Sequence, residues 1–187
     1  MQILDPTPRT LDDATSMERA RGGDTESFRI VYERHAAAVR GYALGRVGPS
    51  GTDDVVSETF AEAWRARASF DPRAPSARPW LYGIATNVVA RHREREERWL
   101  VANQRAASSA VDVVDEPTAY SIDPELARAI GLLAPALRDV FLLTSLAELS
   151  VAETARALGT TAVAARVRLH RARQQLRATL SEGADHA

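Results

Sequence analysis

Residues 150–180 constrain the fold more than any other segment, because they have the pattern of two helices joined by a tight turn. Ser150 and Glu153 have the spacing of a capping box, which predicts the start of a helix. Gly159 can take the left-handed conformation that a tight exit needs, and Thr160 or Thr161 can cap the next helix. Apolar residues then recur at helical spacing on one face of that second helix, at Ala162, Ala165, Leu169, Ala172, Leu176 and Leu180. The segment is predicted to form a helix-turn-helix.

The second of these helices is strongly basic. Residues 150–180 carry six Arg and one Glu, whereas the whole chain has a net charge of −1. Solvated helices normally mix the two signs of charge. With Leu169 at the centre of the buried face, the outer face consists of Val163, Val167, His170, Arg171 and Gln174. Such a helix fits the DNA major groove, where Arg reads guanine and apolar groups contact thymine methyls; the alternative is a helical hairpin with a solvated basic face.

The composition excludes several classes of protein. The chain has no Cys, which rules out disulfides, thiolate metal sites and cysteine catalysis, and its four His lack the spacing of metal ligands. It has no nucleophile elbow, phosphate-binding glycine loop or HExxH motif, so we expect no enzyme activity, no cofactor and no metal. No apolar run approaches the ~20 residues of a membrane span, and no signal pattern opens the chain. We therefore expect a cytoplasmic protein without membrane insertion.

The region before the helix-turn-helix is also helical, without strand-like alternation. Residues 1–25 have the composition of a mostly loose tail, with one helical turn near residues 16–21. Three helices are expected next, over residues 26–47, from Thr52 as a cap to about residue 68, and from Pro79 to about residue 98. Residues 101–122 lose the periodicity and are predicted to be a linker. Two further helices follow, the first beginning at Asp123 and Pro124, and Ala134 and Pro135 separate them.

Three carboxylates share one face of the second expected helix. Asp54, Glu58 and Glu62 lie four residues apart, so their charges repel weakly. A solvated acidic face is one interpretation. The other is a docking surface for a basic partner helix, with Phe60 and Trp64 as apolar anchors.

The segment from Ser69 to Trp80 combines aromatic and Arg side chains. It contains Phe70, Arg73 and Arg78 and leads into a helix that carries Asn87 and Arg91. Aromatic rings beside Arg can stack unpaired bases and hold a strand backbone. The alternative is that Trp80 packs in the core and the rest is a solvated loop.

Three segments in order resemble the extracytoplasmic-function sigma factors of bacterial RNA polymerase. They are DDVVSETFAEAWR (residues 53–65), PWLYGIATNVVARHR (residues 79–93), and LLAPALRDVFLL (residues 132–143) with the helix-turn-helix after it. The resemblance covers residues 26–180. It implies an all-α fold of two small helical domains joined by a flexible linker, the C-terminal one a helix-turn-helix. The implied divisions are a tail (1–25), region 2 (26–100), the linker (101–122) and region 4 (123–182).

The resemblance also implies roles for individual residues. Docking on core RNA polymerase would use Asp53, Asp54, Glu58, Phe60 and Trp64. Recognition and melting of the −10 promoter element would use Phe70, Arg73, Arg78, Trp80, Asn87 and Arg91. Reading of the −35 element would use Arg166, Val167, His170 and Arg171. The implied partners are core RNA polymerase, promoter DNA and an anti-sigma factor, which members of this family often have.

The chain departs from the family's pattern at two places. Ala90 stands where the family usually has an acid, three residues after the Asn of the melting helix. The recognition helix usually opens with Gly-Thr-Val and has Ser before the next Arg; this chain has instead Val163, Ala164, Ala165 and Val167. Two hydroxyl groups are thereby lost, so we expect an unusual −35 sequence.

Two other classes of function are alternatives to the one that this resemblance implies. A stand-alone helix-turn-helix regulator would bind DNA as a dimer and use its N-terminal domain to bind a ligand or partner. A helical enzyme would need a catalytic group, and the sequence offers none. The order and spacing of the three matching segments favour the sigma factor.

Overall fold

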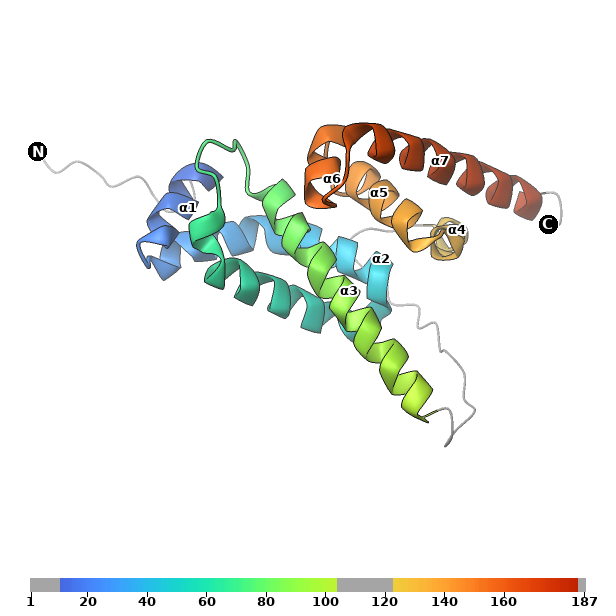
Figure 1. Ribbon diagram of the computed structural model, residues 1–187, viewed down its shortest axis with the longest axis horizontal. Coiled ribbons are helices and arrows are strands. Elements are labelled where there is room, and N and C mark those ends of the chain that lie inside the picture. Colours follow the sequence, from blue (N-terminus) through green and yellow to red (C-terminus); the bar gives the residue numbers. More distant parts are fainter. Residues whose placement is uncertain (1–10, 104–122, 185–187) are drawn as a thin grey trace, which may run out of the picture.

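The computed structural model describes residues 11–103 and 123–184. Its elements are α1 (Asp13–Arg21), α2 (Thr25–Arg65), the short 3₁₀ helix η2 (Arg67–Ser69), α3 (Arg78–Asn103), α4 (Pro124–Leu132), α5 (Pro135–Ser145), α6 (Val151–Ala157) and α7 (Ala162–Ala184). Helices α1–α3 form one unit, and α4–α7 form a second unit beside α2 and α3 (Figure 1). No strand occurs in either described range. The predicted all-α class is confirmed; all but the first three residues of the predicted linker, residues 104–122, lie outside the described residues.

Helix α1 corrects the prediction of a mostly loose N-terminal tail. The Asp12 side chain caps it by accepting a hydrogen bond of 2.8 Å from the backbone N–H of Thr15. Met17 and Ala20 are fully buried, and the helix packs against α2. An isolated helix of this length is unstable in water, and its own apolar pattern is weak. Tertiary packing, which the local sequence does not reveal, holds it in place.

Helix α2 bends at Gly48, which has a φ of 72° inside an otherwise helical run. Glycine adopts this conformation without the steric penalty of a Cβ atom, and Pro49 then takes the first position of the second half. The sequence placed the helix start at Thr52, but its hydroxyl donates a hydrogen bond of 2.7 Å to the carbonyl of Gly48 within the helix. The expected break is therefore present, but within α2 only Gly48 has non-helical backbone angles. Thr52 lies inside the helix and does not cap it.

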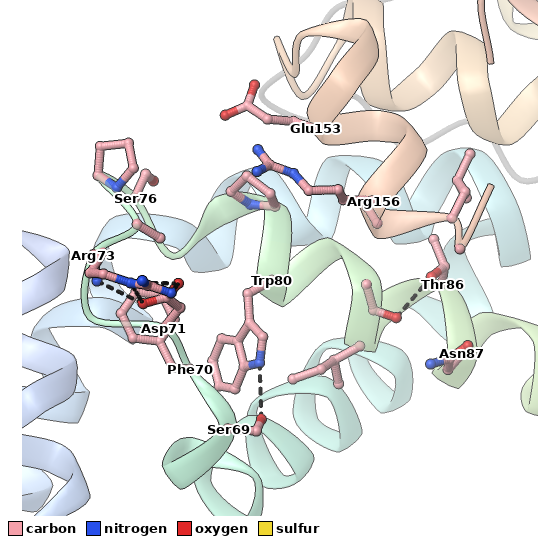
Figure 2. Close-up of a pocket in the computed structure, with 18 residues that line it drawn as sticks. Ser69, Phe70, Asp71, Arg73, Ser76, Trp80, Thr86, Asn87, Glu153 and Arg156 are labelled. Carbon is pink, nitrogen blue, oxygen red and sulfur yellow. Dashed lines mark hydrogen bonds and ion pairs between the residues drawn. The ribbon is translucent and has the colours of Figure 1, made fainter. Parts of the chain in front are cut away.

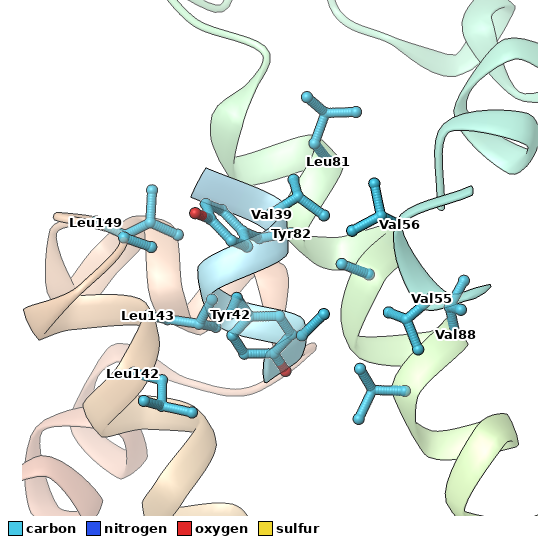
Figure 3. Packing of buried hydrophobic residues seen from close by; sticks show 14 of the residues in the cluster. Val39, Tyr42, Val55, Val56, Leu81, Tyr82, Val88, Leu142, Leu143 and Leu149 are labelled. Carbon is cyan, nitrogen blue, oxygen red and sulfur yellow. The ribbon is translucent and has the colours of Figure 1, made fainter. Parts of the chain in front are cut away.

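The hydrophobic core continues from the first unit into the second. Val39 and Val55 of α2 pack with Leu81 and Val88 of α3. The same buried cluster includes Leu142, Leu143 and Leu149 of the second unit (Figure 3). The rings of Tyr42 and Tyr82 meet edge to face, with centroids 5.6 Å apart. The two units thus share apolar surface.

A buried polar contact joins the same two units. The Tyr42 hydroxyl donates a hydrogen bond of 2.9 Å to Asp139 Oδ1, and Arg46 Nε lies 2.6 Å from the same oxygen. The Arg46 side chain is 5% exposed and that of Asp139 is 18% exposed. Gly45 lies so close to α5 that a Cβ atom there would come within 3.1 Å of a methyl carbon of Leu142. Helices α2 and α5 therefore meet over a contact that is tight as well as charged.

The helix-turn-helix has the predicted local structure. Both hydrogen bonds of the Ser150–Glu153 capping box are present at the start of α6. Gly159 has a φ of 59°, in the left-handed region, and Thr161 Oγ1 accepts a hydrogen bond of 3.1 Å from the Ala164 N–H at the start of α7. In the part of the chain that the structure describes, no helix is long and apolar enough to cross a membrane.

Candidate nucleic-acid interface

The outer face of α7 presents basic and apolar side chains together. Its inner face is buried against α4, α5 and α6, through Ala165, Leu169, Ala172 and Leu176. Val163 is 67% exposed and Val167 is 45% exposed. Arg166, His170 and Arg171 are exposed beside them. This is the division of faces that the sequence predicted, except that Ala162 is exposed and Leu180 is half-buried.

The charge of this helix is not neutralised by the part of the chain that the structure describes. Between residues 162 and 180 it has five Arg and no acid. Among the side chains that the structure describes, those of residues 11–99 and 123–181, no carboxylate forms an ion pair with any of these Arg residues. A basic surface with unpaired guanidinium groups and exposed methyl groups suits the major groove.

The loop from Phe70 to Arg78 departs from its predicted arrangement at its first residue. Phe70 is only 2% exposed, and its ring meets that of Trp80 edge to face with centroids 5.6 Å apart (Figure 2). The Trp80 Nε1–H donates a hydrogen bond of 3.3 Å to Ser69 Oγ. Phe70 therefore anchors the start of the loop in the core, because burying its ring against Trp80 removes apolar area from water. The ring is not accessible for stacking on a base.

The tip of this loop is exposed and is held by an internal ion pair. The Arg73 guanidinium lies 2.9 Å from Asp71 Oδ2, and the Arg73 N–H donates a hydrogen bond of 3.0 Å to Asp71 Oδ1. These bonds from Arg73 lower the pKa of Asp71 to about 2. Arg73 remains exposed, so its guanidinium is accessible to a phosphate or a base. Arg78 lies at the far end of the loop, with its guanidinium 3.8 Å from Glu148 of the second unit.

An open cavity of about 1000 Å³ lies between this loop and helix α6. Its lining includes Trp80 and Asn87 of α3 on one side and Glu153 and Arg156 of α6 on the other (Figure 2). Asn87 is exposed, and Trp80 is half-buried. The structure thus brings Arg73, Trp80 and Asn87 to one surface. The sequence prediction did not include Arg156 in this site. A single basic residue in a short, largely apolar helix was the only sign of it in the sequence.

Arg91 lies on a different surface from the loop residues. Its guanidinium pairs with Glu58 and Glu62 of α2, and Arg95 lies 2.9 Å from Glu58. Partial burial raises the pKa of Glu58, but the bonds from Arg95 and Arg91 outweigh this and leave the pKa below its ordinary value. The predicted acidic face is therefore partly neutralised by α3. Arg91 is committed to this network in the described structure, which weakens its assignment to the −10 site.

The aromatic residues of the predicted docking face differ in exposure. Phe60 is 5% exposed and packs edge to face with Phe28 and Tyr32, so it belongs to the core and is not an accessible anchor. Trp64 is half-buried and carries the Arg67 guanidinium 4.2 Å above its ring. Asp53 pairs with Arg40, and Asp54 is exposed. Tyr32, 43% exposed beside Phe60, supplies aromatic surface that the sequence prediction did not connect with this face.

Two family models match the chain. The model for Sigma-70 region 2 matches residues 31–99, which include the loop and the acidic face. The model for Sigma-70, region 4 matches residues 124–176, which include the helix-turn-helix. The two matches fall on the two helical units described above.

Individual relatives match nearly the whole chain. The RNA polymerase sigma factor NccH of Alcaligenes xylosoxydans xylosoxydans is 34% identical over 93% of this chain and 97% of its own length. The ECF RNA polymerase sigma factor SigD of Mycobacterium bovis is 31% identical over 90% of this chain and 84% of its own length.

Solved structures agree with these relatives. CnrH in complex with the cytosolic domain of CnrY has a TM-score of 0.69 at 29% identity and covers 91% of this chain and 97% of that one. RpoE of Bartonella quintana in complex with NepR shares the fold, with a TM-score of 0.72 at 20% identity over 83% of this chain and 98% of that one. The two matched regions, the relatives and the shared fold lead to one conclusion: the chain belongs to the extracytoplasmic-function sigma factors of RNA polymerase.

Proposed function

We propose that this sigma factor binds core RNA polymerase reversibly, directs it to promoters with its own −35 and −10 elements, and assists promoter melting. The outer face of α7 reads the −35 element through Arg166, Val167, His170 and Arg171. The exposed surface formed by Arg73, Trp80 and Asn87 holds the melted −10 strand, and Arg78 flanks it. The observation that carries this proposal is the exposed basic face of α7 within a matched region 4.

The docking surface for core polymerase is assigned to the α2 face around Asp53, Asp54 and Glu58, with Trp64 at its edge. Asp54 is exposed, and Asp53 and Glu58 pair with Arg side chains at or near the surface. A basic partner helix can replace such surface ion pairs at little cost, because each contributes less than about 1 kcal/mol. The factor performs no reaction of its own, since the polymerase supplies the chemistry.

We also infer an anti-sigma partner and a cytoplasmic location. The similar structure of CnrH was solved in complex with the cytosolic domain of CnrY. The cavity between the loop and α6 is accessible in this chain and has both aromatic and Arg side chains in its lining. A partner bound there would cover Trp80 and Asn87 and so prevent contact with DNA.

Transcription in vitro tests the whole proposal. Core polymerase, a library of promoter fragments and the purified protein are combined, and transcripts are sequenced. The expected result is a set of starts that appears only when the protein is added. Tight, specific operator binding by the protein alone, with no effect on core polymerase, would instead support the stand-alone regulator.

Replacing Arg171 by Ala tests the assignment of the −35 reader. A bidentate contact between Arg and a base contributes about 1–3 kcal/mol of discrimination, so we expect a roughly tenfold to hundredfold loss of −35-dependent transcription. Affinity for core polymerase should not change. Arg177→Ala is the matched control, because Arg177 is exposed on the same helix but lies six residues beyond Arg171, away from the N-terminal turns that are assigned to the DNA. Equal losses in the two variants would contradict base reading by Arg171.

Val163 and Val167 set the expected specificity of this reader. Both valines are exposed on the face assigned to DNA, where the family usually carries hydroxyl-bearing side chains nearby. Methyl groups in the major groove favour thymine over bases without a methyl group. The −35 elements recovered from the transcription library should therefore contain thymine opposite these positions.

A further inference from the structure

Asp13 of α1 is a buried carboxylate that reaches the end of the loop. Its side chain is 4% exposed. Asp13 Oδ2 accepts hydrogen bonds from the Ala77 N–H at 2.7 Å and from the Ser76 hydroxyl at 2.9 Å, and it lies 2.8 Å from His35 Nε2. Arg34 pairs with the other carboxylate oxygen. Helices α1 and α2 and the loop before α3 therefore meet at one charged side chain.

This arrangement keeps Asp13 ionised. Burial alone raises the pKa of the carboxyl group, but the hydrogen bonds from His35, Ala77 and Arg34 outweigh it and hold the pKa well below its ordinary value. A carboxylate only accepts hydrogen bonds, so His35 must carry its proton on Nε2 to donate. A buried charge is tolerated only when such partners compensate for the water it has lost.

The two residues that Asp13 holds define the start of α3. Ser76 Oγ accepts a hydrogen bond of 3.2 Å from the Arg78 N–H, and the Ala77 carbonyl accepts one of 2.9 Å from the Leu81 N–H. Trp80 lies in the first turn that follows. At the other end, the loop is fixed by the buried ring of Phe70. Residues 71–75 are thus held between two anchors, one apolar and one ionic.

We propose that Asp13 is a positioning residue for capture of the −10 strand: by holding Ser76 and Ala77, it fixes the loop and the first turn of α3 where Arg73 and Trp80 can contact unpaired bases. The inference rests on the proposed function of this loop. It also gives the N-terminal helix a role in promoter melting, although α1 lies outside the residues 31–99 that match region 2. Asp13 touches no base itself.

The test measures single-stranded DNA binding by the full chain assembled with core polymerase. The probe is the non-template strand of a promoter from the transcription library, with 2-aminopurine in the −10 element to report unstacking. Asp13→Asn keeps the shape but replaces an acceptor oxygen with a donor, and should weaken binding at least tenfold and reduce the fluorescence change. Asp12→Asn is the matched control. It removes the same charge from the neighbouring residue, and Asn caps a helix as well as Asp does, so binding should stay within twofold.

Two further measurements separate positioning from general destabilisation. Affinity for core polymerase and for −35 duplex DNA should not change in Asp13→Asn, because α7 and the acidic face of α2 are remote from this contact. Ser76→Ala removes one donor from the half-buried Ser76 side chain and leaves the buried charge in place, so it tests the idea even where Asp13→Asn folds poorly. Ser76→Ala should weaken binding of the probe about threefold. The double variant should bind the probe no more weakly than Asp13→Asn alone.

The failures of the two proposals are distinguishable. If the wild-type holoenzyme binds the −10 probe no better than an unrelated strand, the proposed function of the loop is wrong. If wild type discriminates and Ser76→Ala and Asp13→Asn bind like wild type, Asp13 has no positioning role. A parallel loss of core affinity in Asp13→Asn, with Ser76→Ala unchanged, also overturns the inference.

Discussion

Replacing Phe70 by Ala is expected to lower the free energy of unfolding of the first helical unit by about 3–5 kcal/mol, the usual effect of removing a buried aromatic ring. Phe70 is 2% exposed and packs against Trp80. Removing the Phe70 ring also exposes the side of Trp80 that the ring covers. Equilibrium unfolding in urea, followed by circular dichroism, measures this change.

The contrast with Arg73→Ala makes the result informative. Arg73 is exposed on the same loop, and its pair with Asp71 is a surface contact, so its loss should leave the free energy of unfolding nearly unchanged. Binding of single-stranded −10 DNA should fall instead. Phe70→Leu, which keeps most of the buried apolar area, should recover much of the lost stability. If Phe70→Ala weakened DNA binding without changing stability, Phe70 would be a base contact, as the sequence first suggested.

Replacing Asp139 by Ala should separate the two helical units. It removes the only carboxylate that pairs with Arg46 in the described structure, and Arg46 is 5% exposed. It also leaves the Tyr42 hydroxyl without its acceptor. Removing one partner of a buried ion pair costs about 3–5 kcal/mol, and the partial exposure of Asp139 places the expected value near 3 kcal/mol. The chain can avoid this cost by parting α5 from α2 and hydrating Arg46.

Small-angle scattering and calorimetry measure this separation. The radius of gyration should rise and the midpoint of thermal unfolding should fall. Glu148→Ala is the matched control, because Glu148 is an exposed acid at the same boundary, 3.8 Å from Arg78, and its loss should change neither quantity appreciably. An unchanged radius in Asp139→Ala would show that the apolar contact of Leu142 and Leu143 holds the units together without the ion pair.

Separation bears on the proposed function, because the packed arrangement brings the loop before α3 and the helix-turn-helix to one cavity. The Ala157 carbonyl of α6 would lie 3.6 Å from a Cβ atom at Gly83 of α3, so the two DNA-binding units are in contact. Promoter elements two helical turns apart are separated by roughly 70 Å. The units must therefore part on DNA, and Asp139→Ala should retain transcription once bound to core polymerase.

The helix-turn-helix could be predicted from sequence because its signals are local. The capping box of Ser150 and Glu153, the left-handed Gly159 and the Thr161 cap each act within a few residues. The exposure of Val163 and Val167 followed from helical periodicity alone. The break at Gly48 was likewise visible in the sequence. The helix after it begins before Thr52, whose hydroxyl bonds to the Gly48 carbonyl within the helix.

The sequence by itself thus determined the helices other than α1, the two matched regions and the basic face of α7, since these depend on short-range hydrogen bonds and periodicity. Tertiary structure decided which candidates are accessible. It buried Phe60 and Phe70, paired Arg91 with acids of α2, and joined Asp13 to Ser76 across 63 positions of the chain. Burial and ion pairing depend on what approaches from elsewhere in the chain. No local pattern records that approach, so only the folded molecule shows that α1 holds the loop.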